Sequence, residues 1–220
     1  MSGHSKRAFL FAGPTLYGVP QGSIDAGGVV VLPPAKRNDI ARLVAEMARP
    51  ETIILVDGVF HSHAAPGHIE LRSALQSGWR VFGVSSMGAI RASEMEGLGM
   101  VGFGEVFELF RANPDFSDDE VTLLHKAVAP FTPFSEPMVH IRALLDYLSE
   151  TDRLDRTVAH EVCLRLKDLW FGYRTVEQLR DFIARGREAP SLNEIQEALP
   201  RCRVKTHDLT RFLEERVWEK

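Results

Sequence analysis

A serine at a strand-to-helix junction is the residue in this sequence best suited to covalent chemistry. The segment 81–96, "VFGVSSMGAIRASEME", passes from an apolar strand-like run into a helical pattern, and Ser86 stands at the junction. Ser86-Met87-Gly88 resembles the second half of the G-x-S-x-G nucleophile elbow, where a sharp turn presents a serine and helix amides stabilise an oxyanion. Val84 replaces the first glycine of that pattern. The alternative is that Ser85 or Ser86 caps the helix.

Two further segments offer groups that bind anions or move protons. Lys36 and Arg37 follow a β-branched run and precede a helical pattern, where adjacent cations form a corner for carboxylate or phosphate. Asp39 is the expected N-cap of that helix. His68 stands at another helix start, with Glu70 two residues on, and is a candidate general base or substrate contact.

The sequence predicts neither a metal site nor a cofactor site. His61, His63 and His68 lie within eight residues, but no nearby helix supplies a fourth ligand of the kind that zinc needs. "GLGMVG" at 97–102 matches G-x-G-x-x-G but follows a helix, whereas a dinucleotide site requires strand, turn and helix in that order. We therefore predict a glycine loop there, no metal and no cofactor.

The remaining polar candidates have structural alternatives. Asp57 lies near the end of a strand-length apolar run at 52–60. Arg91 and Glu94 lie about one turn apart on the helix after Ser86, so they are expected to pair with each other or to contact substrate. The acidic group 118–120 opens another predicted helix, where negative charge suits the helix dipole, and a structural role is favoured for it.

The elements that position these residues alternate between strand and helix. Strand-like runs occupy 8–12, 27–35, 52–60 and 80–84, and helical patterns occupy 39–48, 68–79 and 87–96. This order predicts an α/β fold with a mostly parallel sheet in a three-layer core. Ligand sites in such sheets gather at the carboxyl ends of the strands, and Asp57 and Ser86 both fall there.

The chain changes character near residue 130. Amphipathic patterns follow, with Ile141, Leu144, Leu145 and Leu148 on one helical face. Thr175 opens a later helical pattern, and Ser191 with Glu194 has capping-box spacing at the start of another. We predict an α/β core domain at 1–130 and a C-terminal helical extension of four or five helices at 131–220.

Composition limits the classes of partner. The net charge of −4 gives no electrostatic footprint for nucleic acid or an anionic membrane. No apolar run reaches the ~18 residues of a membrane span, and "AFLFA" at 8–12 is too short for a secretory signal. Cys163 and Cys202 are far apart, so no disulfide is expected and a cytoplasmic setting is favoured.

Taken together, several segments resemble the TfuA-like proteins. The resemblance extends over residues 9 to about 150 in the same order, with departures at Asn38, where the family tends to have glycine, and Ser85, where it tends to have alanine. The segments that carry it are "GPTL" (13–16), "PPAKRNDI" (33–40), "DGVF" (57–60), His68 with Glu70, "FGVSSMGAIRASE" (82–94), "GMVGFGEVFE" (99–108), "DDEV" (118–121) and "PFSEPMVHIRALL" (133–145).

The resemblance implies a partner of YcaO-type ATP-dependent cyclodehydratases. Such a partner helps in backbone thioamidation of ribosomal peptides or of methyl-coenzyme M reductase. It obtains sulfide by hydrolysing a thiocarboxylated, ubiquitin-like sulfur-carrier protein. The alternatives are a non-catalytic module that docks the carrier or activates YcaO allosterically, and a general serine peptidase or esterase. Homo-oligomerisation is left open.

Under the hydrolase interpretation each candidate residue has a role. Ser86 attacks the thiocarboxylate carbon, and Lys36 or His68 activates it, as Ser–Lys and Ser–His pairs do elsewhere. Amides near Met87 and Gly88 hold the oxyanion, and Arg37 or Arg91 binds the anionic end. Asp57 and Glu94 complete the expected set of substrate contacts.

Overall fold

The computed structural model describes residues 7–58, 64–184 and 189–220. The chain forms two compact units, one made of Met1–Phe116 with Lys205–Lys220 and the other of Ser117–Val204. This division differs from the predicted one at residue 130, because the helical unit begins earlier and the last helix belongs to the sheet unit. Each unit is described by itself.

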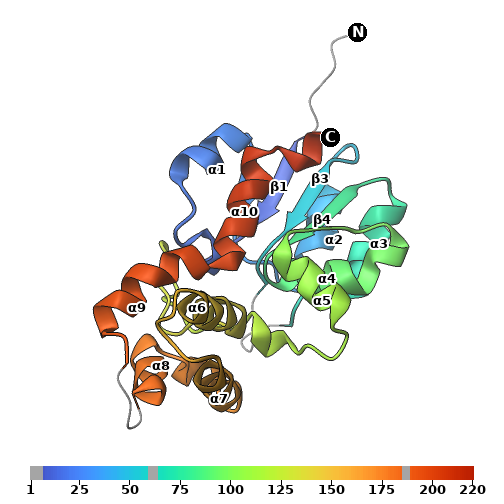
Figure 1. Cartoon of the computed structure of the whole chain (residues 1–220). Helices are drawn as coiled ribbons and strands as arrows, with labels where there is room; N and C mark the ends of the chain where they lie inside the picture. Colours follow the sequence, from blue (N-terminus) through green and yellow to red (C-terminus); the bar gives the residue numbers. More distant parts are fainter. Residues whose placement is uncertain (1–6, 59–63, 185–188) are drawn as a thin grey trace. The chain divides into compact units, whose positions relative to one another are not determined.

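The sheet unit contains five parallel strands in the order β2-β1-β3-β4-β5, of which Figure 1 labels β1, β3 and β4. This strand order is one of the common doubly wound arrangements, in which ligands bind beyond the carboxyl ends of β1 and β3. The α/β class and the parallel sheet are therefore confirmed. The strands are β1 Ala8–Phe11, β2 Val30–Leu32, β3 Thr52–Leu55, β4 Arg80–Val84 and β5 Val101–Phe103.

The edge strand β5 was not expected, because the sequence predicted a glycine loop over 97–102. Val101, Gly102 and Phe103 pair with the last three residues of β4 in parallel register. The strand is only three residues long and partly exposed, so it lacks the buried apolar run that marks β3 and β4.

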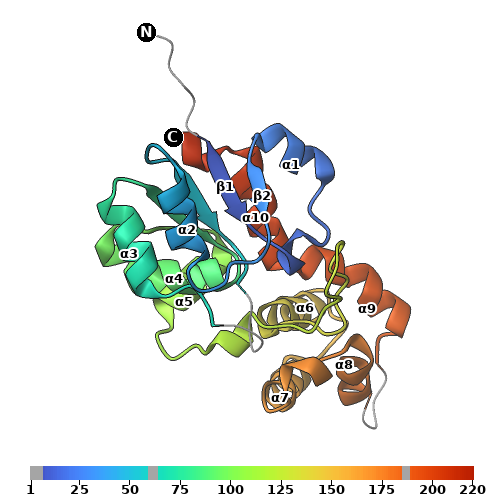
Figure 2. The same ribbon diagram turned by 180° about the vertical axis from the view of Figure 1, so that it is seen from behind.

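Helices cover both faces of the sheet. Alternate residues of the strands, including Leu10, Ile54 and Phe82, point to a face on which the last helix packs with Leu209 and Phe212. Figure 1 shows this helix, α10, over one face, and Figure 2 shows α2 and α3 over the other. The helices of this unit are α1 Gln21–Gly27, α2 Asp39–Glu46, α3 His68–Gln76, α4 Met87–Met95, α5 Glu105–Ala112 and α10 Val204–Glu214.

A carboxylate on α10 caps the start of α5. Asp208 accepts hydrogen bonds from the amides of Glu105 and Val106, at 2.8 and 2.9 Å. Burial raises the pKa of Asp208 to about 6, although these two backbone hydrogen bonds oppose the change. Gly104 has φ +98°, and a side chain there would meet the Asp208 carboxylate, so glycine is required at this contact.

The second unit consists of helices and connecting loops over its described residues, and an isolated antiparallel bridge joins His125 and Pro133 in the loop before α6. Its core contains Ile141, Leu144, Leu145 and Leu148, the four residues that the helical spacing placed on one face. Ser191 and Glu194 form the predicted capping box, in which the Ser191 amide donates to Glu194 Oε2 at 2.8 Å. The helices are α6 Met138–Glu150, α7 Arg156–Lys167, α8 Val176–Ile183 and α9 Leu192–Ala198.

The acidic group at 118–120 organises an ion network within this helical unit. Glu120, only 1% exposed, receives two hydrogen bonds from Arg142, both 3.0 Å long, and lies 2.9 Å from Lys167 Nζ. Burial raises the pKa of Glu120, but the hydrogen bonds from Arg142 and Lys167 outweigh it and the net pKa is lowered. Asp119 pairs with Lys167 and Arg174, and its pKa falls to about 2 although burial opposes the change. These contacts support the predicted structural role.

None of the helices over the described ranges combines the length and the apolar character needed to cross a membrane.

Candidate functional site

The predicted serine lies on a tight turn between β4 and α4. The Ser86 amide donates to the Val84 carbonyl at 2.8 Å, which closes a three-residue turn centred on Ser85. Ser85 has φ +67°, an unusual conformation for a residue with a side chain. The sequence predicted Ser86 as the residue at the centre of the sharp turn, whereas the residue with positive φ is Ser85.

The hydroxyls of the two serines differ in their contacts. Ser85 is fully buried, and its Oγ donates to the Lys205 carbonyl at 2.8 Å, so this hydroxyl links the turn to α10. Ser86 is the N-cap residue of α4 by position, but its side chain makes no capping hydrogen bond. Ser86 is 2% exposed. The capping alternative therefore does not account for the Ser86 hydroxyl, and Ser85 is engaged elsewhere.

Gly88 serves close packing of helix on strand, and its amide is occupied. The Gly88 amide donates to the Val56 carbonyl at 3.0 Å. A Cβ at Gly88 would lie 1.8 Å from the Leu55 carbonyl oxygen, and one at Gly83 would lie 2.1 Å from the Gly88 carbonyl oxygen. This corrects the prediction that the Gly88 amide holds an oxyanion. Within the described residues the Met87 amide, the first of α4, has no such partner and remains the candidate donor.

Asp57 binds the loop that follows β1. Its Oδ2 accepts from the amides of Gly13 and Thr15, at 2.8 and 3.0 Å, and its Oδ1 accepts from Thr15 Oγ1 at 2.7 Å. Asp57 and Thr15 are 1% and 2% exposed. The carboxylate predicted to contact substrate thus holds the "GPTL" loop at the carboxyl ends of β1 and β3. Sequence reasoning assigned Thr15 no role. Its position in the loop directly after the first strand was a usable signal, because ligand sites gather at the carboxyl ends of parallel strands.

The loop after β2 lies beside Asp57 at the edge of the sheet formed by the carboxyl ends of the strands. The Ala35 amide donates to the Asp57 carbonyl at 2.9 Å, and Ala35 bridges Gly58. A Cβ at Gly58 would lie 2.1 Å from Met87 Sδ and 3.3 Å from the Ala35 carbonyl oxygen, so the start of α4 lies beside this loop. Lys36, the residue after Ala35, therefore joins the edge that carries Asp57 and the serine turn.

Lys36 and Arg37 are available to an anion at that edge. Both residues are exposed, and neither side chain makes an ion pair with another described residue. Asp39 instead accepts from the Lys36 amide at 2.9 Å and pairs with Arg42 at 2.6 Å. The predicted anion-binding corner therefore keeps two unneutralised cations.

His68, Arg91 and Glu94 form a separate cluster. His68 Nε2 lies 2.8 Å from Glu94 Oε2, and Arg91 Nη1 donates to the same oxygen at 2.6 Å. Arg91 Nε also donates to the Pro66 carbonyl at 3.2 Å, which fixes the start of α3 against α4. Arg91 and Glu94 thus pair as expected, and His68 joins them. Eight residues of helix, about 12 Å along its axis, separate Ser86 from Glu94.

The structure thus brings the serine turn, Asp57 and the loop with Lys36 and Arg37 together at the carboxyl ends of the strands, without completing a catalytic triad. Among the residues that the structure describes, no hydrogen bond joins the Ser86 hydroxyl to Lys36 or His68. The described residues contain no group of three or more His, Cys, Asp and Glu side chains that could hold a metal ion. His61 and His63, considered for zinc, lie outside the described residues.

The fold and this edge define a doubly wound α/β protein with a serine-bearing strand–helix turn and an open cationic corner. The family model described as "TfuA-like protein" matches residues 57–175, which contain the serine turn, the His68 cluster and the buried ion network. The chain belongs to the TfuA-like family. A search of curated proteins found no match.

Proposed function

We propose that the protein is a partner of a YcaO-type cyclodehydratase in peptide backbone thioamidation, and that it supplies sulfide by hydrolysing a thiocarboxylated, ubiquitin-like sulfur carrier. One observation carries the hydrolase part. The Ser86 hydroxyl stands at the first turn of α4 without capping it, while the loop with Lys36 and Arg37 lies at the same sheet edge. Membership of the TfuA-like family supports the pathway.

The proposed reaction has two balanced steps. Ser86 Oγ bonds to the thiocarboxylate carbon, and its proton passes to a base. The carbon–sulfur bond then breaks, and the base returns that proton to the leaving sulfur, which departs as hydrosulfide. Water then cleaves the acyl-serine ester, which restores the hydroxyl and leaves a carboxylate on the carrier. The net reaction consumes one water and needs no oxidant or reductant.

Each neighbouring group has a role that follows from its position. The Met87 amide, at the positive end of α4, is placed to stabilise the oxyanion that forms on the carbon. Lys36 and Arg37 attract the anionic thiocarboxylate. Their positive charges offset the cost of bringing this anion to the buried serine turn. Asp57 keeps the 13–16 loop in place through three hydrogen bonds and acts as a positioning residue.

The base is Lys36 or His68, and separate substitutions distinguish the two. Lys36→Met and His68→Asn each remove one proton acceptor from an exposed side chain. The variant that loses hydrolysis while still binding the carrier identifies the base. If both retain wild-type rates, neither residue activates the serine.

A docking module is the second candidate function. It is favoured by the low exposure of Ser86 and by the contact of His68 with Glu94 in place of the serine. In this case Lys36, Arg37 and the His68 cluster form a surface for the carrier or for YcaO.

Measurement of sulfide separates the proposals. Purified protein is incubated with a thiocarboxylated carrier, with and without YcaO. Release without YcaO supports the hydrolase, and release only with YcaO supports the docking module. Turnover of simple esters together with labelling by a fluorophosphonate would identify a general serine hydrolase.

A further inference from the structure

The helical unit contains a polar pocket of about 400 Å³ that has no part in the proposed hydrolysis. It lies between α6 and α7 and is open to solvent. Arg142, Asp146, Ser149 and Glu150 line it from α6, and Arg156, His160 and Cys163 line it from α7. All of these residues lie within one compact unit.

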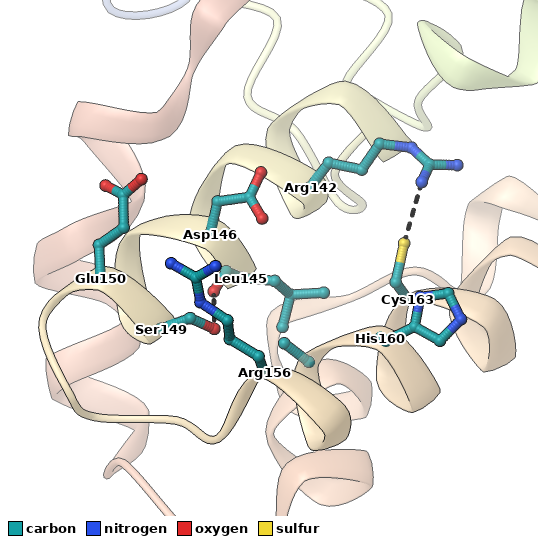
Figure 3. Close-up of a pocket in the computed structure, with 9 residues that line it drawn as sticks. Arg142, Leu145, Asp146, Ser149, Glu150, Arg156, His160 and Cys163 are labelled. Carbon is teal, nitrogen blue, oxygen red and sulfur yellow. Dashed lines mark hydrogen bonds between the residues drawn. The ribbon is translucent and has the colours of Figure 1, made fainter.

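Opposite charges face each other across this pocket. Asp146 and Glu150 lie four residues apart on α6, and Arg156 and His160 lie four residues apart on α7, so each pair occupies one helical face. Figure 3 shows Asp146 and Arg156 extending into the same space from the two helices. The pocket therefore has an acidic wall and a basic wall.

The two walls do not neutralise each other. All four side chains belong to exposed residues, and none of them makes an ion pair of 4.0 Å or less with any other described residue. Arg142, at the end of the pocket, is different. Glu120 holds its guanidinium through two hydrogen bonds, and its Nη1 donates to Cys163 Sγ at 3.2 Å. Arg142 is therefore held by other groups of the helical unit, and Arg156 supplies the open positive charge, with the imidazole of His160 one turn away on the same helix.

We infer that this pocket binds a small dipolar ligand, a short peptide with a free ammonium group and a free carboxylate. The ammonium group contacts Asp146 and Glu150, and the carboxylate contacts Arg156 and His160. Such a ligand joins the two walls through charge-assisted hydrogen bonds that the side chains do not make with each other. A ligand with one charge satisfies only one wall.

The test is a titration of the full-length protein with triglycine, followed by two-dimensional ¹H–¹⁵N NMR. We expect saturable shifts confined to the amides of α6 and α7, with a Kd of about 5 mM or lower. N-acetyl-triglycine and triglycine amide, which each lack one charge, should bind at least about fivefold more weakly.

Three variants locate the binding. Asp146→Asn and Arg156→Gln each remove the charge of one wall at an exposed position, so both should fold and both should weaken binding of triglycine at least about fivefold. Arg165→Gln is the matched control, since Arg165 is an exposed arginine of the same helix that does not line the pocket. Its Kd should equal that of the wild type.

Three results would overturn the inference. The first is the absence of saturable shifts with triglycine, which would leave the four side chains as ordinary solvated charges. The second is equal binding of the capped peptides. The third is unchanged binding by both Asp146→Asn and Arg156→Gln.

Discussion

Replacement of Gly88 by alanine tests how the serine turn is built. The added Cβ would lie 1.8 Å from the Leu55 carbonyl oxygen and 2.6 Å from its carbonyl carbon. A Cβ atom in a protein essentially never lies closer than 3.0 Å to a heavy atom of a residue that is not its chain neighbour. The first turn of α4 or strand β3 must therefore move by about 1.2 Å to widen the 1.8 Å contact to that limit. Because the opposing atoms belong to the backbone, no side-chain rotation relieves the clash.

The expected loss of stability follows from this movement. Overpacking in a closely packed interior costs about 1–3 kcal/mol. The same movement disturbs the 3.0 Å hydrogen bond from the Gly88 amide to Val56, whose loss costs about 1 kcal/mol. We therefore predict that Gly88→Ala lowers the free energy of unfolding of the sheet unit by about 2–4 kcal/mol.

Urea unfolding followed by tryptophan fluorescence measures this loss. Trp79 and Trp218 lie in the sheet unit and Trp170 in the helical unit, so a Trp170→Phe background reports on the sheet unit alone. Gly97→Ala is the control, because a Cβ at Gly97 would have no atom within 4 Å. A Gly88→Ala midpoint within the error of the Gly97→Ala midpoint would refute the described contact of α4 with β3.

Three further predictions concern buried polar groups. Thr15→Val removes the hydroxyl that donates to Asp57 Oδ1 and should destabilise the sheet unit by about 1–3 kcal/mol in urea unfolding. Glu120→Gln removes the carboxylate that holds Arg142, a half-exposed cation, and should destabilise the helical unit by about 1–3 kcal/mol, measured with Trp170 fluorescence. The pKa of Asp208 is raised to about 6 in the folded protein, so its contribution to stability is present below pH 4 and lost as the pH rises through 6. Asp208→Asn should remove that part of the pH dependence of unfolding.

Each of these has a contrary result. Asp118→Asn is the control for Glu120→Gln, since Asp118 is an exposed acid of the same segment, and equal effects of the two would contradict the buried network. For Thr15→Val, an unchanged unfolding midpoint would mean that the hydroxyl does not stabilise the 13–16 loop. For Asp208, a stability difference between wild type and Asp208→Asn that stays constant from pH 4 to 7 would exclude the raised pKa.

Much of the fold was predictable because its signals are local. The buried runs of β3 and β4 and the capping residues at Thr175 and Ser191 depend on neighbours within a few positions. Two features lacked such signals. Strand β5 is three residues long and follows glycines, and the packing of α10 on the sheet joins residues more than 100 positions apart, as in the contact of Ser85 with Lys205.

The places of the candidate residues in the fold were predictable, but their contacts were not. The strand–helix alternation correctly placed Ser86 and Asp57 near the ends of adjacent strands. The partner of Asp57 lies 42 residues away at Thr15, and the partner of His68 lies 26 residues away at Glu94, so neither pairing follows from spacing. Occupation of the Gly88 amide depends on how closely α4 approaches β3, which the sequence indicates only through its glycines.

The central claim is that the Ser86 hydroxyl attacks the carrier thiocarboxylate. The most direct measurement is the rate of sulfide release from a thiocarboxylated carrier by the wild type, Ser86→Ala and Ser93→Ala. Ser93 lies on the same helix and donates to the Ile90 carbonyl at 2.8 Å, so its variant controls for loss of a hydroxyl from α4. The proposal predicts a rate at least about 100-fold lower for Ser86→Ala and a near wild-type rate for Ser93→Ala. Equal sulfide release by wild type and Ser86→Ala would contradict it.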